Sequence, residues 1–231
     1  MELSTCFPGR QKPAINRKPE ALIFDFDGVL ADTERLYWNA WATLLASHDI
    51  EFSWEDYCKV GRGVQDESML EGIAELAANP SLLAIIRLEL PARRQMVERC
   101  WREKLPICET TIQLLHDLKG YPLGLVTTSN RADVQPMLES AGIADCFSAA
   151  VFGEDTIHHK PHPAPYILIR ERLGIRGGVV FEDSEAGLQS AKRAGFEALR
   201  IPEPEDLPGI VRSRVGLSCG SDLTSLKGLS C

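Results

Sequence analysis

The sequence predicts an α/β protein, with a doubly wound parallel sheet as its core and an inserted segment that is entirely helical. Short apolar runs alternate with helical patterns, which is the order that parallel βαβ units produce. Polar side chains follow three of these runs, at the edge where such sheets bind ligands. About 80 residues of helical character separate the first two runs, which is too long for a simple crossover.

The apolar runs have the length of buried strands, and the segments between them repeat apolar residues at helical spacing. We predict strands at 21–26, 121–128, 148–152 and 177–183, with a weaker one at 197–201. We predict helices at 109–118, 131–141, 163–173 and 184–194.

The helical insert is assigned to residues 34–105, which leaves 1–33 and 106–231 for a Rossmann-like core. Asp32 is the expected N-cap of the first helix of the insert, and Glu34 is favourable in its first turn. One face of that helix collects apolar and aromatic residues: Leu36, Tyr37, Ala40, Trp41, Leu44 and Leu45.

All four tryptophans lie in the insert, at Trp38, Trp41, Trp54 and Trp101. A small helical domain needs bulky residues for its own core, and this is the first interpretation. The second is that one or two of them line a ligand cleft between the domains. The basic segment 92–104 is expected to be a solvated helix face rather than a partner site.

Composition excludes several classes of function. The formal charge of −8 disfavours general binding to nucleic acid or to an anionic membrane. No apolar run approaches the ~18 residues that a membrane span needs. The seven cysteines are odd in number and form no C-x-x-C pair, which favours reduced thiols in a cytoplasmic protein over disulfides or a zinc site. No pattern sets the oligomeric state, and we expect a monomer.

Asp25 and Asp27 interrupt an apolar strand in the run FDFDGVLADTE, residues 24–34. Burying two ionised groups is costly unless they are paired or bind a cation. At positions i and i+2 of a strand, both side chains face the same way. One carboxylate can bind Mg²⁺ and act as a nucleophile while the other moves a proton, and Glu182 and Asp183 can complete a magnesium site.

An anion-binding site is predicted beside these acids. Lys160 supplies the fixed positive charge that a transferred phosphoryl group needs. Thr127 and the amides of 128–130 lie at a predicted strand-to-helix turn, where backbone donors and the helix dipole favour an anion.

Four motifs in this order resemble those of the haloacid dehalogenase superfamily, over residues 21–201. They are DFDGVLADTE, LVTTSN, HKPHPAPY and VFEDSEAGLQSAKRAG. The similarity is to the branch of β-phosphoglucomutase-like and phosphoglycolate-phosphatase-like proteins, which carry a helical cap. Each motif alone is weak to moderate, whereas all four with a helical insert after the first are highly specific.

The resemblance implies a role for each matching residue. Asp25 would be the nucleophile that forms an aspartyl-phosphate, and Asp27 would protonate the leaving oxygen and then activate water. Mg²⁺ would be held by Asp25, the Asp27 backbone carbonyl and Asp183, with Glu182 close by. Thr127 and Lys160 would hold phosphoryl oxygens. The implied substrate contacts are Thr128, Ser129, Asn130, Thr33, Tyr37, Trp41 and Arg62.

Two departures from the family pattern and one matching residue refine this expectation. Ala164 stands where the third motif often has Asp, at a position we regard as structural. Tyr37 stands where mutase relatives carry a His, and a phenol with a pKa near 10 is a poor proton shuttle. Dehalogenase and phosphonatase relatives lack the second aspartate of the first motif, which this chain has as Asp27. Tyr37 therefore argues against a mutase, and Asp27 favours hydrolysis of a phosphate ester.

The expected function is therefore Mg²⁺-dependent hydrolysis of a small phosphomonoester, such as a sugar phosphate or a related metabolite. A sugar-phosphate mutase and a non-catalytic binding module on the same fold are the alternatives. Substrate specificity is expected to come from the insert. The loop around Gly61 and Gly63 is either a simple turn or a segment that reaches the substrate. In the second case, Arg62 would contact a second anionic group of the substrate.

Overall fold

The structure is a computed structural model, and it describes residues 18–61, 66–76 and 81–217. Five parallel strands form one sheet in the order β3-β2-β1-β4-β5. The strands are β1 (Leu22–Phe24), β2 (Leu123–Val126), β3 (Ala149–Val151), β4 (Val179–Glu182) and β5 (Glu197–Arg200). All five lie within predicted runs, so the predicted α/β fold with a parallel sheet is confirmed.

The strand order places β1 at the centre of the sheet. Leu22 pairs with Leu123 of β2 on one side and with Val179 of β4 on the other. The carboxyl ends of β1, β2 and β4 therefore meet at one edge, and the predicted polar residues follow these strands there.

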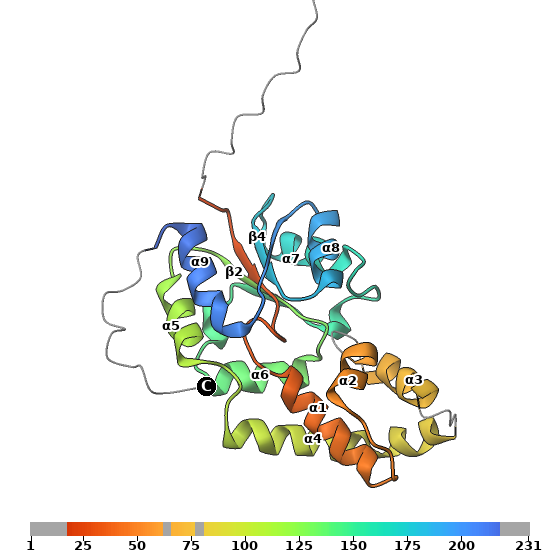
Figure 1. The fold of residues 1–231 in the computed structure, drawn as a ribbon. Helices are drawn as coiled ribbons and strands as arrows, with labels where there is room; N and C mark the ends of the chain where they lie inside the picture. Colours follow the sequence, from red (N-terminus) through yellow and green to blue (C-terminus); the bar gives the residue numbers. More distant parts are fainter. Residues whose placement is uncertain (1–17, 62–65, 77–80, 218–231) are drawn as a thin grey trace, which may run out of the picture.

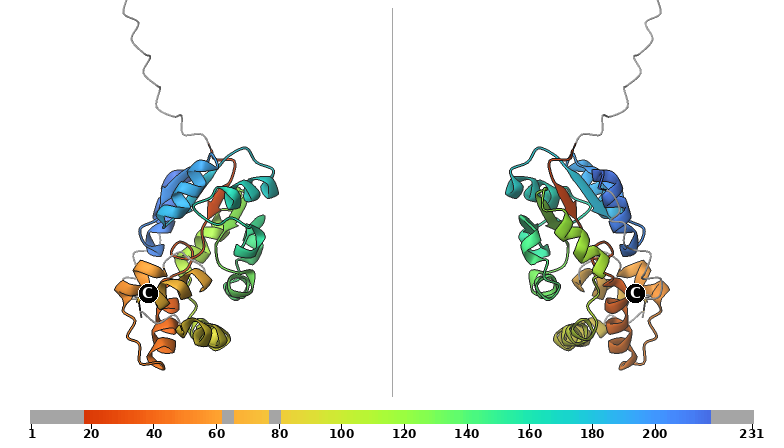
Figure 2. Two further views of the ribbon diagram at one scale, coloured as in Figure 1. Left: turned by 90° about the vertical axis from the view of Figure 1, so that its right-hand side faces the viewer. Right: turned by 90° about the vertical axis from the view of Figure 1, so that its left-hand side faces the viewer.

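Helices cover both faces of the sheet (Figures 1 and 2). Ile23 and Val180 belong to one buried cluster together with Tyr166 and Ile169, whereas Leu22 and Phe24 belong to another together with Leu114. The core helices are α5 (Glu109–Asp117), α6 (Arg131–Ser140), α7 (Ala164–Leu173), α8 (Glu185–Arg193) and α9 (Leu207–Val215), with short 3-10 helices η1 (Ala144–Cys146), η2 (Gly153–Asp155) and η3 (Pro204–Asp206).

Helix α9 was not predicted from the sequence. Both ends of this helix have typical start and stop signals in the sequence. Pro208 lies in its first turn, and Gly216 ends it in the left-handed region at φ 71°. Its Val211 is fully buried in the same cluster as Leu114 of α5.

Four further helices follow β1 and lie together below the carboxyl edge of the sheet in Figure 1. They are α1 (Glu34–Ala46), α2 (Trp54–Val60), α3 (Asp66–Leu76) and α4 (Leu82–Glu103). Their buried residues form a cluster of their own around Trp41, Leu45 and Ile73. Ala40, Val97 and Trp101 instead pack into the core cluster, so α1 and α4 join the two parts.

The start of α1 differs from the prediction. Its N-cap is Thr33 rather than Asp32, and no side chain caps it. The hydroxyl of Thr33 is used elsewhere, because it donates a hydrogen bond to Asp27. By contrast, α2 begins with a capping box in which Ser53 and Asp56 bond each other's backbone amides.

Candidate active site

Lys160 is the buried cation of the site. Its side chain is 5% exposed, and its Nζ lies 2.9 Å from Asp25 Oδ1 and 2.5 Å from Glu182 Oε1. Nζ also donates a hydrogen bond of 3.1 Å to the carbonyl oxygen of Val126, at the end of β2. Burial would lower the pKa of Lys160, but the charges of Asp25 and Glu182 outweigh it and raise the pKa above its usual value. The ammonium group therefore stays charged.

Glu182 ends β4 and is fully buried. It accepts hydrogen bonds from the hydroxyl of Tyr166, at 2.8 Å, and from that of Ser184, at 3.0 Å. Ser184 also caps α8, because its Oγ accepts from the amide of Gly187. A Cβ at Gly187 would overlap the Glu182 carboxylate, so glycine lets the helix pass directly over it. Glu182 is thus held in one orientation against Lys160.

A group of three carboxylates that could hold a metal ion lies beside this ion pair. Asp25, Glu182 and Asp183 each offer a carboxylate oxygen, and these oxygens lie within 4.8 Å of one another. Gly28 has φ 73° and lies directly against Asp183. A Cβ at this position would overlap the Asp183 carboxylate, so the close approach requires glycine. Burial and the charge of Glu182 raise the pKa of Asp25 well above its usual value, although Lys160 opposes the shift. An all-oxygen, acidic donor set of this kind fits Mg²⁺.

The side chain of Asp27 bonds to three hydroxyl groups. Thr33 donates to its Oδ1 at 2.5 Å. Ser129 donates to its Oδ2 at 2.7 Å, and Thr127 lies 3.3 Å from the same oxygen. The predicted residues Asp27, Thr33, Thr127 and Ser129 are therefore brought together, although the Asp27 carboxylate is outside the three-carboxylate group.

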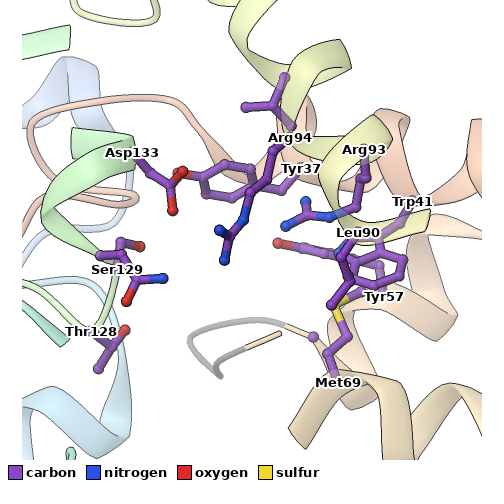
Figure 3. A pocket seen from close by; sticks show the side chains of 13 residues that line it. Tyr37, Trp41, Tyr57, Met69, Leu90, Arg93, Arg94, Thr128, Ser129 and Asp133 are labelled. Carbon is purple, nitrogen blue, oxygen red and sulfur yellow. The ribbon is translucent and has the colours of Figure 1, made fainter. Parts of the chain in front are cut away.

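Two cavities adjoin these groups. The smaller has a volume of about 40 Å³, and Asp25, Asp27, Lys160 and Asp183 line it together with Glu34. The larger has a volume of about 300 Å³ and lies between the helices α1–α4 and the sheet edge (Figure 3). Both cavities are lined by the same five residues where they meet: Tyr37, Tyr57, Gly61, Thr128 and Ser129.

The larger cavity has a core wall and a wall from the inserted helices. Figure 3 shows Thr128, Ser129 and Asp133 on one side, and Arg93 and Trp41 across from them. The predicted substrate contacts Tyr37, Trp41, Thr128, Ser129 and Asn130 all line this cavity. Arg62 lies outside the described residues.

Both interpretations of the tryptophans, as core residues of the insert and as lining of a cleft, apply to Trp41. It is 1% exposed and packs in the cluster of the inserted helices, and it also lines the larger cavity. The guanidinium of Arg93 lies over its ring, 4.6 Å from the ring centre.

The expectation of a solvated face at 92–104 is wrong for Arg93, which is 5% exposed and lines the cavity. Arg94 is exposed and also lines the cavity, where its guanidinium extends towards the core wall (Figure 3). Glu34 of α1, Tyr57 of α2 and Asp133 of α6 also line the cavities, and none of them was predicted as a site residue. An acidic residue in a first helical turn is favoured by the helix dipole, so no sequence signal places Glu34 in a site.

The fold and this site define a class of protein, in which a doubly wound sheet carries an acidic site with a buried lysine at its carboxyl edge. The sequence model of the family described as haloacid dehalogenase-like hydrolase matches residues 22–201. The chain belongs to this family, and the predicted family and the prediction of a hydrolase are confirmed.

Three relatives illustrate the family's range. The chain is 30% identical over 183 residues to fructose-1-phosphate phosphatase YqaB of Escherichia coli, covering 78% of this chain and 95% of that one. It is also 30% identical over 182 residues to a phosphorylated carbohydrates phosphatase of Thermotoga maritima, covering 78% and 83%. A crystal structure of a putative β-phosphoglucomutase from Thermotoga maritima superposes with a TM-score of 0.66 at 26% identity, covering 84% and 99%.

Proposed function

We propose that this hydrolase is a Mg²⁺-dependent phosphatase that acts on a small phosphomonoester, a sugar phosphate or a related metabolite. The observation that carries the proposal is the pairing of Asp25 with buried Lys160, beside an Asp27 that three hydroxyls orient. The relatives named as phosphatases of phosphorylated sugars support the same substrate class.

The proposed first step is attack by an Asp25 carboxylate oxygen on the phosphorus atom. The bond from phosphorus to the ester oxygen breaks, and Asp27 donates a proton to that oxygen, so an alcohol leaves. An aspartyl-phosphate forms on Asp25. Lys160 and the hydroxyl of Thr127 hold the phosphoryl oxygens, and the charge of Lys160 offsets that of the reacting group.

In the second step, Asp27 takes a proton from a water molecule that attacks the aspartyl-phosphate. The phosphorus–Asp25 bond breaks, which releases inorganic phosphate and restores the carboxylate. Asp25, the backbone carbonyl of Asp27 and Asp183 would hold Mg²⁺, with Glu182 close by. The ion would neutralise charge on the phosphoryl oxygens.

We further propose that residues 34–105 act as a cap over a core made of 1–33 and 106–231. The larger cavity, between the two, would hold the part of the substrate that leaves as an alcohol. Closure of the cap would exclude water during the first step. Arg93 and Arg94 would contact polar or anionic groups of the substrate far from the scissile bond. The sequence predicts the same role for Arg62, which lies outside the described residues.

A mutase is the second candidate, because a putative β-phosphoglucomutase is among the similar structures. Tyr37 argues against it. Burial, followed by the charges of Asp27 and Asp133, raises the pKa of Tyr37 well above its usual value. A phenol in that state does not move protons at neutral pH. A requirement for a bisphosphate activator would favour the mutase.

The test is phosphate release from a panel of phosphorylated metabolites, with and without Mg²⁺, by the wild type and by Asp25→Asn. We expect release from a few related esters, and a loss of about 10³-fold or more in the variant because the nucleophile is gone. Circular dichroism would show that the variant is folded. If the folded wild type releases no phosphate with Mg²⁺ present, a mutase or a binding module becomes the better assignment.

A further inference from the structure

Glu182 and Asp183, two of the three grouped carboxylates, are consecutive residues where β4 ends and the chain turns into α8. The peptide unit that follows Asp183 is held at both of its ends. Its carbonyl oxygen, that of Asp183, accepts a hydrogen bond of 2.6 Å from Arg200 Nη1. Its amide, that of Ser184, donates a hydrogen bond of 3.3 Å to Glu182 Oε2. The orientation of this peptide unit therefore depends on Arg200 on one side and on Glu182 on the other.

Arg200 is the last residue of β5, and a second contact fixes its side chain. Its Nη2 donates a hydrogen bond of 2.9 Å to Glu185 Oε2, at the start of α8. The guanidinium group can bridge a carbonyl and a carboxylate because its donors point in fixed directions. The next residue, Ile201, donates its backbone amide to the carbonyl oxygen of Glu182 at 2.8 Å. The end of β5 thus holds the backbone of both neighbouring acids.

This support bears on the carboxylates that could hold Mg²⁺. Without the bond to Arg200, the peptide unit can rotate about its long axis, which draws the Ser184 amide away from Glu182 and allows the Asp183 carboxylate to shift. A metal ion binds tightly when its ligands are already held in one arrangement. Residues that hold metal ligands in place typically change metal affinity by about 10–100-fold.

The charge of Arg200 has the opposite effect, because a cation near the site repels Mg²⁺. This repulsion is small for two reasons. The Arg200 side chain is 49% exposed, so water screens its charge, and Glu185 pairs with it at 2.9 Å. Since positioning and charge change the affinity for Mg²⁺ in opposite directions, an experiment can separate them.

We propose that Arg200 is a positioning residue for Mg²⁺, which it supports by fixing the peptide unit between Asp183 and Ser184 and not by contact with the ion or the substrate. This role rests on the proposed Mg²⁺-dependent phosphatase function and deepens it. It assigns part of the metal affinity to a side chain of β5, the edge strand beside β4.

The test is the Kd for Mg²⁺ of the wild type, Arg200→Lys and Arg200→Gln. Isothermal titration calorimetry, or the rise in Tm with Mg²⁺ concentration, gives this Kd without any substrate. We expect Kd to rise about tenfold in both variants, because neither side chain can bridge Asp183 and Glu185 as the guanidinium does. At saturating Mg²⁺, kcat for a phosphate ester should stay within about twofold of the wild type, since Arg200 touches no reacting group.

Arg214→Lys is the matched control. Arg214 of α9 donates hydrogen bonds of 3.0 and 2.7 Å to Glu197, the first residue of β5. Because the strands are parallel, that amino end of β5 lies away from the carboxyl edge where the acids gather. The same substitution there breaks a similar arginine–glutamate pair and should leave the Kd for Mg²⁺ unchanged.

The outcomes separate this proposal from the one on which it rests. If the wild type binds Mg²⁺ and both Arg200 variants bind it as tightly or more tightly, the role of Arg200 is wrong and the phosphatase stands. A lower kcat at saturating Mg²⁺ with an unchanged Kd would also overturn that role. If the folded wild type neither binds Mg²⁺ nor hydrolyses an ester in its presence, the proposed phosphatase is wrong, and the role of Arg200 falls with it.

Discussion

At the scale of single residues, the site depends on charged side chains that would each be costly to bury alone and that stabilise one another when buried together. Lys160, Asp25 and Glu182 are all buried, and removing Lys160 would leave two buried carboxylates without the cation that they share. The hydroxyl groups of Tyr166 and Ser184 add the hydrogen bonds that such a buried group requires. The same contacts leave Asp25 a fixed orientation towards the cavity.

Gly187 gives a direct test of this close packing. Gly187→Ala would place a methyl group on the Glu182 carboxylate, and we expect it to lower the free energy of unfolding by roughly 2 kcal/mol or more. The substitution should also reduce phosphate release, because Glu182 cannot move without disturbing Lys160. Urea unfolding and the phosphate assay measure the two effects.

Gly209 is the matched control, since it also lies within a helix and a Cβ there would meet nothing within 4 Å. Gly209→Ala should leave stability unchanged or raise it by about 0.5–1 kcal/mol through helix propensity. Equal stability of the two alanine variants would contradict the close contact of α8 with Glu182.

At the scale of elements, Asp155 links three segments around β3. It ends the short helix η2, and it accepts hydrogen bonds from the amide of Phe152 and from Arg172 of α7. Arg131 of α6 lies 3.6 Å from the same carboxylate. Burial would raise the pKa of Asp155, but these partners outweigh it and lower the pKa below its ordinary value of 3.8.

A lowered carboxyl pKa makes stability depend on pH in a defined direction. Asp155 stabilises the fold at pH values above 3.8, and this contribution is lost as pH falls through its lower folded-state pKa. Asp155→Asn should therefore be less stable than the wild type by about 1–2 kcal/mol at pH 7, with the difference shrinking below pH 4. Thermal unfolding across pH 2.5–7 tests this, and a difference that is constant over the whole range would contradict it.

At the scale of the whole molecule, two packed parts meet at the site. The cluster around Trp41 belongs to the inserted helices, and the sheet lies within the other two clusters. Among the described residues, no helix is both long enough and apolar enough to cross a membrane. The larger cavity lies where the two parts face each other, so substrate binding and cap position are expected to be coupled.

Metal binding should be visible in the stability of the whole protein. At a Mg²⁺ concentration of about 100 times Kd, the wild type should gain about 2.7 kcal/mol, or a rise in Tm of roughly 5–10 °C. Asp183→Asn should lose most of this gain, because one of the three grouped carboxylates is removed. Asp49→Asn is the control, since this exposed residue at φ 59° tolerates asparagine. An equal rise in all three proteins would argue against the proposed site.

Much of the core could be predicted from the sequence. Apolar runs at regular intervals predict parallel strands, and the polar residues at their ends meet because the strands share one direction. For this reason Asp25, Asp27, Thr127 and Asp183 could be placed at one edge before any coordinates were considered. Helix α9 was missed although Pro208 and Gly216 mark its ends, because a segment of nine residues is too short to show a clear helical repeat.

The class of fold, the family and the residues at the strand ends could all be predicted, because they follow from local periodicity and from the order of motifs. That Glu34, Arg93 and Asp133 line the cavities could not be predicted, because it depends on tertiary packing. A helical repeat tells which side chains share a face, but not what that face meets. That depends on how α1 and α4 pack against both clusters, through contacts between residues far apart in the chain.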